Sequence, residues 1–146
     1  MNFFLTGLLL KEHNLCTHCD NCIDDIVHYF VQCKTVINFW TEVFNWWQKI
    51  SETVIHVEIC EILFGILNPN EDTTMNVLNV ILTTAKWFIY QCKKGENNIF
   101  FVNYLVYLRH TFEVEKYIEY KNGNKTEFDY KWTLLCDLFN EDIAGI

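Results

Sequence analysis

The chain has 146 residues, of which 51% are hydrophobic and 16% aromatic, and its 19 acidic against 11 basic residues give a formal net charge of −8. This length can bury one sizeable core, whereas the acidic charge argues against tight binding of the isolated chain to a nucleic-acid backbone. No segment has the roughly twenty uninterrupted apolar residues of a membrane span, and the apolar residues 1–10 lack the features of a secretory signal. We therefore expect an intracellular chain, in the nucleus or the cytoplasm, that is not secreted and has no membrane partner.

Metal-binding residue types recur near the amino end with the spacing Cys-x2-Cys-x8-His-x4-Cys. They are Cys16, Cys19, His28 and Cys33. Two cysteines separated by two residues can bind one metal ion from a tight turn, and the histidine and the last cysteine then complete a tetrahedral set. Because protein side chains fill all four positions, none is left for a catalytic water. The spacing predicts one structural Zn²⁺ ion.

Other uses of the seven cysteines stay open. The cysteines can instead be reduced and buried or take part in thiol redox chemistry, and Cys22 or His18 can replace one of the four ligands. A disulfide framework is disfavoured, because the cysteine count is odd, no secretory signal is present and an apolar core is available. The remaining cysteines are expected to act as small buried hydrophobic residues. They are Cys60, Cys92 and Cys136.

Two helices are predicted around the four ligands. Asp24 and Asp25 favour a helix start, which places His28 one turn into the helix and Cys33 at or just past its end. Residues 34–50 then repeat apolar side chains at steps of four and three, which predicts an amphipathic helix. Its inward face is Val36, Trp40, Val43, Trp47 and Ile50, and its outward face is Asn38, Glu42, Asn45 and Lys49.

A connector over residues 51–72 leads to the next helix. It contains an apolar patch, residues 59–67, which has to dock on something. Thr73 or Thr74 is expected to cap a helix that runs to about Lys94 and ends at Gly95. This helix is apolar on most sides, so it should be central to the bundle. Its narrow polar stripe is Asn79, Thr83, Lys86 and Lys93.

The last part of the chain is expected to add a helix over residues 98–121 and a short final helix, separated by a break at residues 122–124. The inward residues are Phe101, Leu105, Leu108, Phe112, Phe128, Trp132, Leu135 and Leu138. The fold class is therefore mainly α, with an N-terminal CCHC zinc knuckle (a short hairpin plus a helix) followed by a bundle of four to five helices. We expect residues 1–50 to form the zinc-binding unit and residues 51–146 a helical tail packed against it.

The segment from residue 15 to residue 47 resembles the zinc-binding region near the C-terminus of reverse transcriptases from LINE-type (non-LTR) retrotransposons. That region reads Cys-x-x-Cys, an acidic stretch, a histidine, four residues, a cysteine and then an aromatic-Trp pair. The matching residues are Cys16, Cys19, Asp24-Asp25, His28, Cys33 and Phe39-Trp40. Residues 61–65, 76–93 and 115–121 are similar to the helical tail that follows in many such elements, so the resemblance covers most of the chain.

The polymerase chemistry of that family has no counterpart here. Its reverse transcriptases carry an aromatic-x-Asp-Asp pair that holds two magnesium ions. The adjacent acidic pairs here, Asp24-Asp25 and Glu71-Asp72, do not lie between apolar strands and are expected to cap helices or sit in loops. No nucleophilic triad or phosphate-binding loop is present either. We expect no enzyme and no small-molecule substrate.

Two functions follow. The resemblance implies a non-catalytic module that engages RNA or DNA in the intact protein, beside an upstream reverse transcriptase domain. The alternative is a zinc-stabilised helical module that docks on another protein, or a decayed element fragment that binds no nucleic acid. Under this alternative, residues 1–10 and 59–67 are the candidate docking patch, since a module separated from its neighbour exposes apolar surface.

Overall fold

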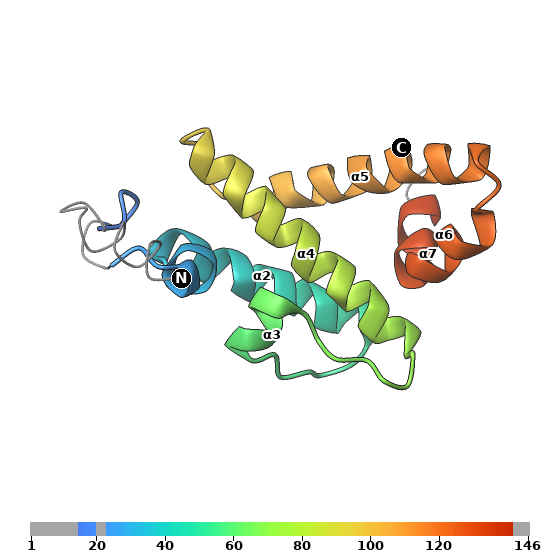
Figure 1. The fold of residues 1–146 in the computed structure, drawn as a ribbon, viewed down its shortest axis with the longest axis horizontal. Helices are drawn as coiled ribbons and strands as arrows, with labels where there is room; N and C mark the ends of the chain where they lie inside the picture. Colours follow the sequence, from blue (N-terminus) through green and yellow to red (C-terminus); the bar gives the residue numbers. More distant parts are fainter. Residues whose placement is uncertain (1–14, 20–22, 142–146) are drawn as a thin grey trace, which may run out of the picture.

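The computed structural model describes residues 15–19 and 23–141, so the expectations for the segment 1–10 and for Cys22 lie outside the described residues (Figure 1). Of the described residues, 72% are helical and none belongs to a sheet, which confirms the mainly α expectation. Where a short hairpin was expected, the described residues have one isolated antiparallel bridge, between Leu15 and Ile23. No helix within it is long and apolar enough to cross a membrane.

The helices pack around one central member, α4. In chain order they are a π-helical turn η1 (His28–Gln32), α2 (Lys34–Ser51), α3 (Ile59–Phe64), α4 (Thr73–Lys94), α5 (Phe101–Lys121), α6 (Lys125–Lys131) and α7 (Thr133–Glu141). Figure 1 shows α4 crossing the molecule diagonally, with α5 along one edge and α6 and α7 together at one end. α4 contacts η1, α2, α5, α6 and α7, as its almost all-round apolar sequence predicts.

α2 presents the predicted apolar stripe to the core. Its four predicted outward residues are all exposed, and of the predicted inward residues only Ile50 is half-buried instead of buried. Phe39 is a further buried residue, and its ring meets Tyr104 of α5 edge-on with centroids 5.4 Å apart. Aromatic contact of this kind fixes α2 against the rest of the bundle. The buried residues are Val36, Phe39, Trp40, Val43 and Trp47.

The two ends of α4 correct one expectation and confirm another. The side chain of Asp72 accepts hydrogen bonds from the backbone N–H groups of Thr74 (2.8 Å) and Met75 (3.4 Å), so Asp72 caps the helix and the prediction of Thr73 or Thr74 was wrong. Gly95 ends the helix as expected. Lys93, predicted on the polar stripe, is only 5% exposed.

The inner face of α5 differs from the predicted one. The helix begins at Phe101, and Tyr104, Leu108 and Phe112 are fully buried. Leu108 and Phe112 confirm the prediction, whereas Phe101 and Leu105 are only half-buried because Tyr104 occupies the centre of the face.

The short final helix is in fact two helices, α6 and α7, which meet at Trp132. Their aromatic rings close around Phe112 of α5, with centroid distances of 5.1–5.4 Å. The rings are Phe128, Trp132 and Phe139. Leu135 is buried as predicted and Leu138 is half-buried. This cluster forms the far end of the core from the knuckle.

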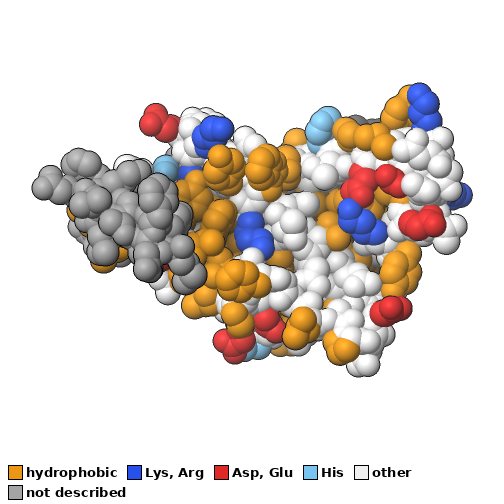
Figure 2. Space-filling view, in the orientation of Figure 1, with side chains coloured by type: hydrophobic (Ala, Val, Ile, Leu, Met, Phe, Trp, Pro, Cys, Tyr) orange, Lys and Arg blue, Asp and Glu red, His pale blue; other side chains and the backbone are white. Residues whose placement is uncertain are grey.

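The connector docks only in part. Ile62 of α3 is buried, and the Lys86 ammonium donates a hydrogen bond to the carbonyl oxygen of Leu63 at 2.7 Å. Phe64 and Leu67, however, are 80% and 92% exposed. Hydrophobic side chains are visible on the surface in this region (Figure 2). The division into units 1–50 and 51–146 stays a prediction, and α2 contacts both α4 and α5 across that boundary.

Candidate metal centre

A short turn presents the first two cysteines. Cys16 and Cys19 lie in the turn that follows Leu15, whose bridge to Ile23 brings the two sides of the knuckle together. The backbone N–H of His18 points at the sulfur of Cys16, with N and Sγ 3.4 Å apart. This arrangement is the one expected when a Cys-x2-Cys turn directs both sulfurs to one point.

The helical turn η1 presents the other two ligands. The Asp25 carboxylate accepts a hydrogen bond from the backbone N–H of His28 at 2.7 Å, so Asp25 has the predicted role at the helix start. The N–H of Cys33 bonds to the carbonyl of His28 at 2.8 Å, a π-type bond spanning five residues. In an α-helix, residues five apart point about 140° away from each other. The wider π turn brings His28 and Cys33 onto one side.

The four predicted ligands converge. Their ligand atoms, three cysteine sulfurs and a histidine nitrogen, all lie within 4.8 Å of one another. The sulfurs of Cys16 and Cys33 are 3.6 Å apart, and the Cys19 sulfur is 3.2 Å from Nε2 of His28. A tetrahedron with metal–sulfur bonds of about 2.3 Å has edges of about 3.8 Å. Cys16, Cys19, His28 and Cys33 therefore form a group that can hold one metal ion.

The alternatives to this ligand set fare differently. Cys22 lies outside the described residues. His18 is half-buried and lies outside the group of four, where it lines a neighbouring polar pocket. All the described cysteines are free thiols, and the 3.6 Å between the Cys16 and Cys33 sulfurs is well beyond the length of a disulfide bond.

The two buried thiols differ in acidity. Burial raises the pKa of Cys16 from its ordinary value near 9 to about 11. Burial also acts on Cys33, but hydrogen bonds from the hydroxyl and the backbone of Thr35, the Cys16 thiol and the charge of Lys93 outweigh it and hold the pKa of Cys33 below its ordinary value. The Thr35 hydroxyl oxygen lies 3.1 Å from the Cys33 sulfur. Cys33 is thus the readier of the two to supply a thiolate.

Lys93 is the residue near the site that sequence reasoning missed. Its ammonium donates a hydrogen bond to the carbonyl oxygen of Tyr29 at 2.7 Å and lies 4.2 Å from the centre of the Tyr29 ring. Tyr29 directly follows His28, so the end of α4 is attached to the segment that carries two ligands. A cation beside a set of three thiolates offsets negative charge there. No local pattern signals this contact, because Lys93 and Tyr29 are 64 residues apart.

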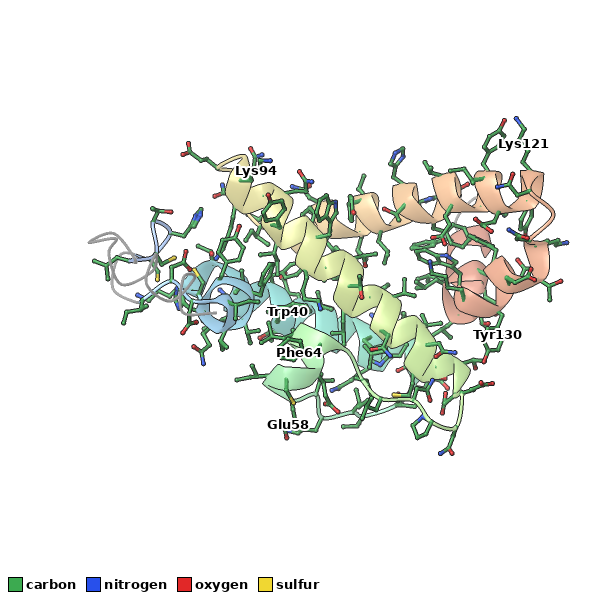
Figure 3. All side chains as sticks on the ribbon, viewed as in Figure 1. Trp40, Glu58, Phe64, Lys94, Lys121 and Tyr130 are labelled. Atoms are coloured by element: carbon green, nitrogen blue, oxygen red, sulfur yellow. The ribbon has the colours of Figure 1, made fainter. Side chains whose placement is uncertain are left out.

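A second long-range contact ties the same segment to α2. The indole N–H of Trp40 donates a hydrogen bond to the carbonyl oxygen of Phe30 at 2.6 Å. Figure 3 shows Trp40 on α2, where this helix passes α4. The knuckle and the π turn therefore present the ligands, and two hydrogen bonds, from Trp40 of α2 and Lys93 of α4, hold this segment against the larger helices; we call these two hydrogen bonds the tethers.

The other candidate residues have ordinary roles. His110 is exposed and lies outside the group of four ligands, and His56 is exposed and pairs with Glu58 at 3.1 Å. Cys92 is buried and Cys136 half-buried, in line with the expectation, whereas Cys60 is exposed and the expectation for it was wrong. The acidic pairs 24–25 and 71–72 each contribute one helix-capping carboxylate.

Comparison of the chain with models of protein families, with curated proteins and with solved structures found no match to any of them. The site therefore has to be interpreted from its own geometry. What the geometry establishes is a three-cysteine, one-histidine group that can hold a metal ion, set into a mainly helical protein.

Proposed function

We propose that Cys16, Cys19, His28 and Cys33 bind one Zn²⁺ ion with a structural role. The observation that carries the proposal is the convergence of their four ligand atoms within 4.8 Å. Three soft sulfurs and one imidazole in a tetrahedral arrangement favour zinc over harder cations. With four protein ligands no open position remains for substrate or water, so the ion supplies shape and no reaction. It would fix the knuckle to η1 and, through the two tethers, to α2 and α4.

Cobalt substitution tests this proposal directly. Co²⁺ bound by three thiolates and an imidazole in a tetrahedron gives intense visible absorption and sulfur-to-metal charge transfer, whereas six-coordinate Co²⁺ is almost colourless. We expect one Co²⁺ per chain with the tetrahedral spectrum, displaced by Zn²⁺, and loss of the charge-transfer band in Cys33→Ser. Cys60→Ser is the control, because Cys60 lies outside the group of four and its replacement should leave the spectrum unchanged. A weak octahedral spectrum of the wild type, or a Cys33→Ser spectrum equal to that of the wild type, would overturn the assignment.

For the protein as a whole we propose a non-catalytic module of the kind found at the C-terminus of LINE-type retrotransposon reverse transcriptases. The metal-site spacing and the Phe39-Trp40 pair support this proposal. In this structure Phe39 packs into the core, and the Trp40 indole donates a hydrogen bond to the carbonyl oxygen of Phe30, close to the ligand His28. The aromatic-Trp pair therefore connects the helix that follows the site both to the core and to the ligand-bearing segment.

One surface supports nucleic-acid engagement in the intact protein. Trp87 of α4 is 51% exposed, and its ring lies 5.4 Å from that of Tyr90. Beyond them, at the end of α4, Lys94 faces solvent beside a pocket of about 330 Å³ between the helix end and the knuckle (Figure 3). Exposed rings can stack on unpaired bases, and lysines can contact phosphates. The pocket is lined by Thr17, His18, Thr35, Lys93, Lys94, Glu96, Asn97, Asn98 and Ile99.

Filter binding of single-stranded RNA and DNA at two salt concentrations tests this function. We expect weak binding, because the chain carries a net charge of −8, and we expect it to fall as salt increases. Trp87→Ala should weaken binding about tenfold, since one base stack contributes about 1–3 kcal/mol. Trp46→Ala serves as the aromatic control, because the Trp46 ring is half-buried and packs against Phe101 of α5. No detectable binding at low salt, or equal effects of the two variants, would contradict it.

The second candidate function, a protein-docking module, is favoured by the exposed connector. Val54, Phe64 and Leu67 are large apolar side chains that remain mostly in water. An apolar surface of this kind is typical of a segment that another protein covers. Binding to a partner through this surface should be insensitive to salt, which separates it from binding to a nucleic acid.

A further inference from the structure

The helix α5 is apolar on two opposite sides. Its inner side buries Tyr104, Leu108 and Phe112 completely. Its outer side carries several large apolar residues that stay in water, of which Val102 is 65%, Val106 66% and Tyr117 68% exposed. A helix that is apolar all round is normally covered on all sides. Figure 1 shows α5 along one edge of the molecule, with α4, α6 and α7 on the same side of it, so nothing among the described helices covers the outer side.

We propose that the outer side of α5 pairs with the same helix of a second copy of this chain, in antiparallel orientation. The outer face is arranged symmetrically along the helix about His110. Val106 and Val114 lie four residues to either side of it, and Val102 and Ile118 lie eight residues to either side; all four are exposed. At about 100° per residue, Val106 and Val114 lie only about 40° to either side of His110 around the helix, so an antiparallel pair crossing at His110 places Val106 against the partner's Val114. Val102 and Ile118 lie about 80° to either side and border this contact. Such a self-complementary patch is what a two-fold symmetric interface requires.

The charges along α5 fit this orientation. The helix has Arg109 as the only formally charged side chain of residues 101–112, whereas residues 113–121 contain Glu113, Glu115 and Glu119 as well as two lysines. Among the described residues neither Arg109 nor Glu113 has an ion-pair partner, while Glu115 is paired with Lys131 at 2.6 Å. In the antiparallel pair Arg109 of each copy lies beside Glu113 of the other, so the two-fold symmetry gives two equivalent ion pairs. A parallel pair would instead place Glu113 beside the partner's Glu113.

The size of the patch limits the strength of the pair. From Val106 to Val114, the two valines that face the partner, the helix rises about 12 Å, at 1.5 Å per residue. One helix pair of this length buries less surface than the roughly 1,200–2,000 Å² of a stable complex. We therefore expect a reversible dimer that dissociates at about micromolar concentration, and not an obligate one. This inference does not depend on the metal centre, which lies at the other end of the core.

Sedimentation velocity of the metal-loaded full chain over a wide range of concentrations tests the proposal. The wild type should show a concentration-dependent change from monomer to dimer. Arg109→Glu and Glu113→Arg should each raise the dissociation constant at least about tenfold, because each places like charges together, and the double variant should restore it. Val106→Lys should abolish the dimer. Val54→Glu, at an apolar site that is 90% exposed on the connector, should leave the dimer unchanged.

Each alternative result decides against the proposal. A wild type that stays monomeric at every concentration overturns it, as does a dimer that survives Val106→Lys. A dimer that dissociates in Val54→Glu assigns the interface to the connector instead. A double variant as weak as the single ones rules out the antiparallel orientation. Circular dichroism of each variant establishes that the helices are intact, and the substituted Val106 side chain is exposed enough to be changed at little cost to folding.

Discussion

Replacing Lys93 by methionine isolates the contribution of one buried charge to the metal centre. Methionine keeps a flexible, unbranched side chain that fills similar space but removes the ammonium. The variant loses the 2.7 Å hydrogen bond to the Tyr29 carbonyl and the 4.2 Å contact with the Tyr29 ring. It leaves the four proposed ligands in place. Any change in metal affinity then reports on electrostatics and on the attachment of α4 to the ligand-bearing segment.

The expected magnitudes differ between the metal-free and metal-loaded protein. The charge-assisted hydrogen bond contributes about 1.5–3 kcal/mol and the cation–π contact about 1–2 kcal/mol, but burial of the ammonium costs several kcal/mol. These contributions nearly cancel, so metal-free stability should change by about 1 kcal/mol or less. Three thiolates and one Zn²⁺ carry a net charge of −1, which attracts the lysine only when the ion is bound. At an effective dielectric of about 20, such charges attract by about 2–4 kcal/mol over 4–8 Å.

The assay is competition for Zn²⁺ against a chelator of known affinity. Lys93→Met should lower zinc affinity about 30-fold, which corresponds to about 2 kcal/mol. Lys86→Met is the matched control, because Lys86 also lies on α4 and donates a 2.7 Å hydrogen bond to a carbonyl, that of Leu63 in α3. It should leave zinc affinity unchanged. Equal zinc affinities for the two variants would refute the role assigned to Lys93.

Three further results are expected. Cys33→Ser should lose the metal and increase hydrogen exchange in the knuckle and η1, while exchange in α4 to α7 stays slow; a uniform increase along the chain contradicts this division. Zinc affinity should rise with pH, because the Cys16 thiol, with its pKa raised to about 11, must lose its proton on binding. The metal-free protein should instead lose stability above pH 9, because the Cys16 thiol ionises at a lower pH in the unfolded chain than in the folded one. If the free energy of unfolding in urea changes with pH in the same way for the metal-free and the metal-loaded protein, this pair of expectations is wrong. Phe112→Ala should destabilise the protein by about 3–5 kcal/mol through the C-terminal ring cluster without changing zinc stoichiometry, and a loss below about 1 kcal/mol in urea unfolding is inconsistent with that cluster.

The metal-binding group was predictable because its signal is local. Cys16, Cys19, His28 and Cys33 lie close together in the sequence, so their spacing can be recognised directly. The acidic pair before His28 indicates a helix start. The helix α2 was equally predictable, because its apolar residues recur at the helical period on one side only. In both cases neighbouring residues determine the structure.

Where several similar residues compete, the pattern was not decisive. Asp72 caps α4 although Thr73 and Thr74 follow it, since its carboxylate reaches two backbone N–H groups at once. Tyr104 takes the centre of the inner face of α5 because its hydroxyl is satisfied there, donating to the Ile81 carbonyl at 3.1 Å. α5 is apolar on both sides, so periodicity alone could not say which side faces inward.

Contacts between residues far apart in the sequence could not be predicted from the hydrophobic pattern. Lys93 falls at helical spacing from Lys86 and was expected to be solvated with it. Both ammonium groups instead bind carbonyl oxygens of distant segments, Tyr29 and Leu63. A long side chain can bury its stem and satisfy its charge in this way, but only the folded chain brings the carbonyl to it.

A single zinc ion held by three thiolates and one imidazole is the feature on which the proposed function rests. Mass spectrometry of the chain under non-denaturing conditions, after purification without added metal and again after incubation with Zn²⁺, measures this stoichiometry most directly. We expect one tightly held zinc per wild-type chain, with the mass showing the loss of protons that ligation requires, and none in Cys33→Ser. A wild-type chain that carries no zinc after incubation, or a Cys33→Ser chain that retains it equally well, would show that these four residues do not form a zinc site.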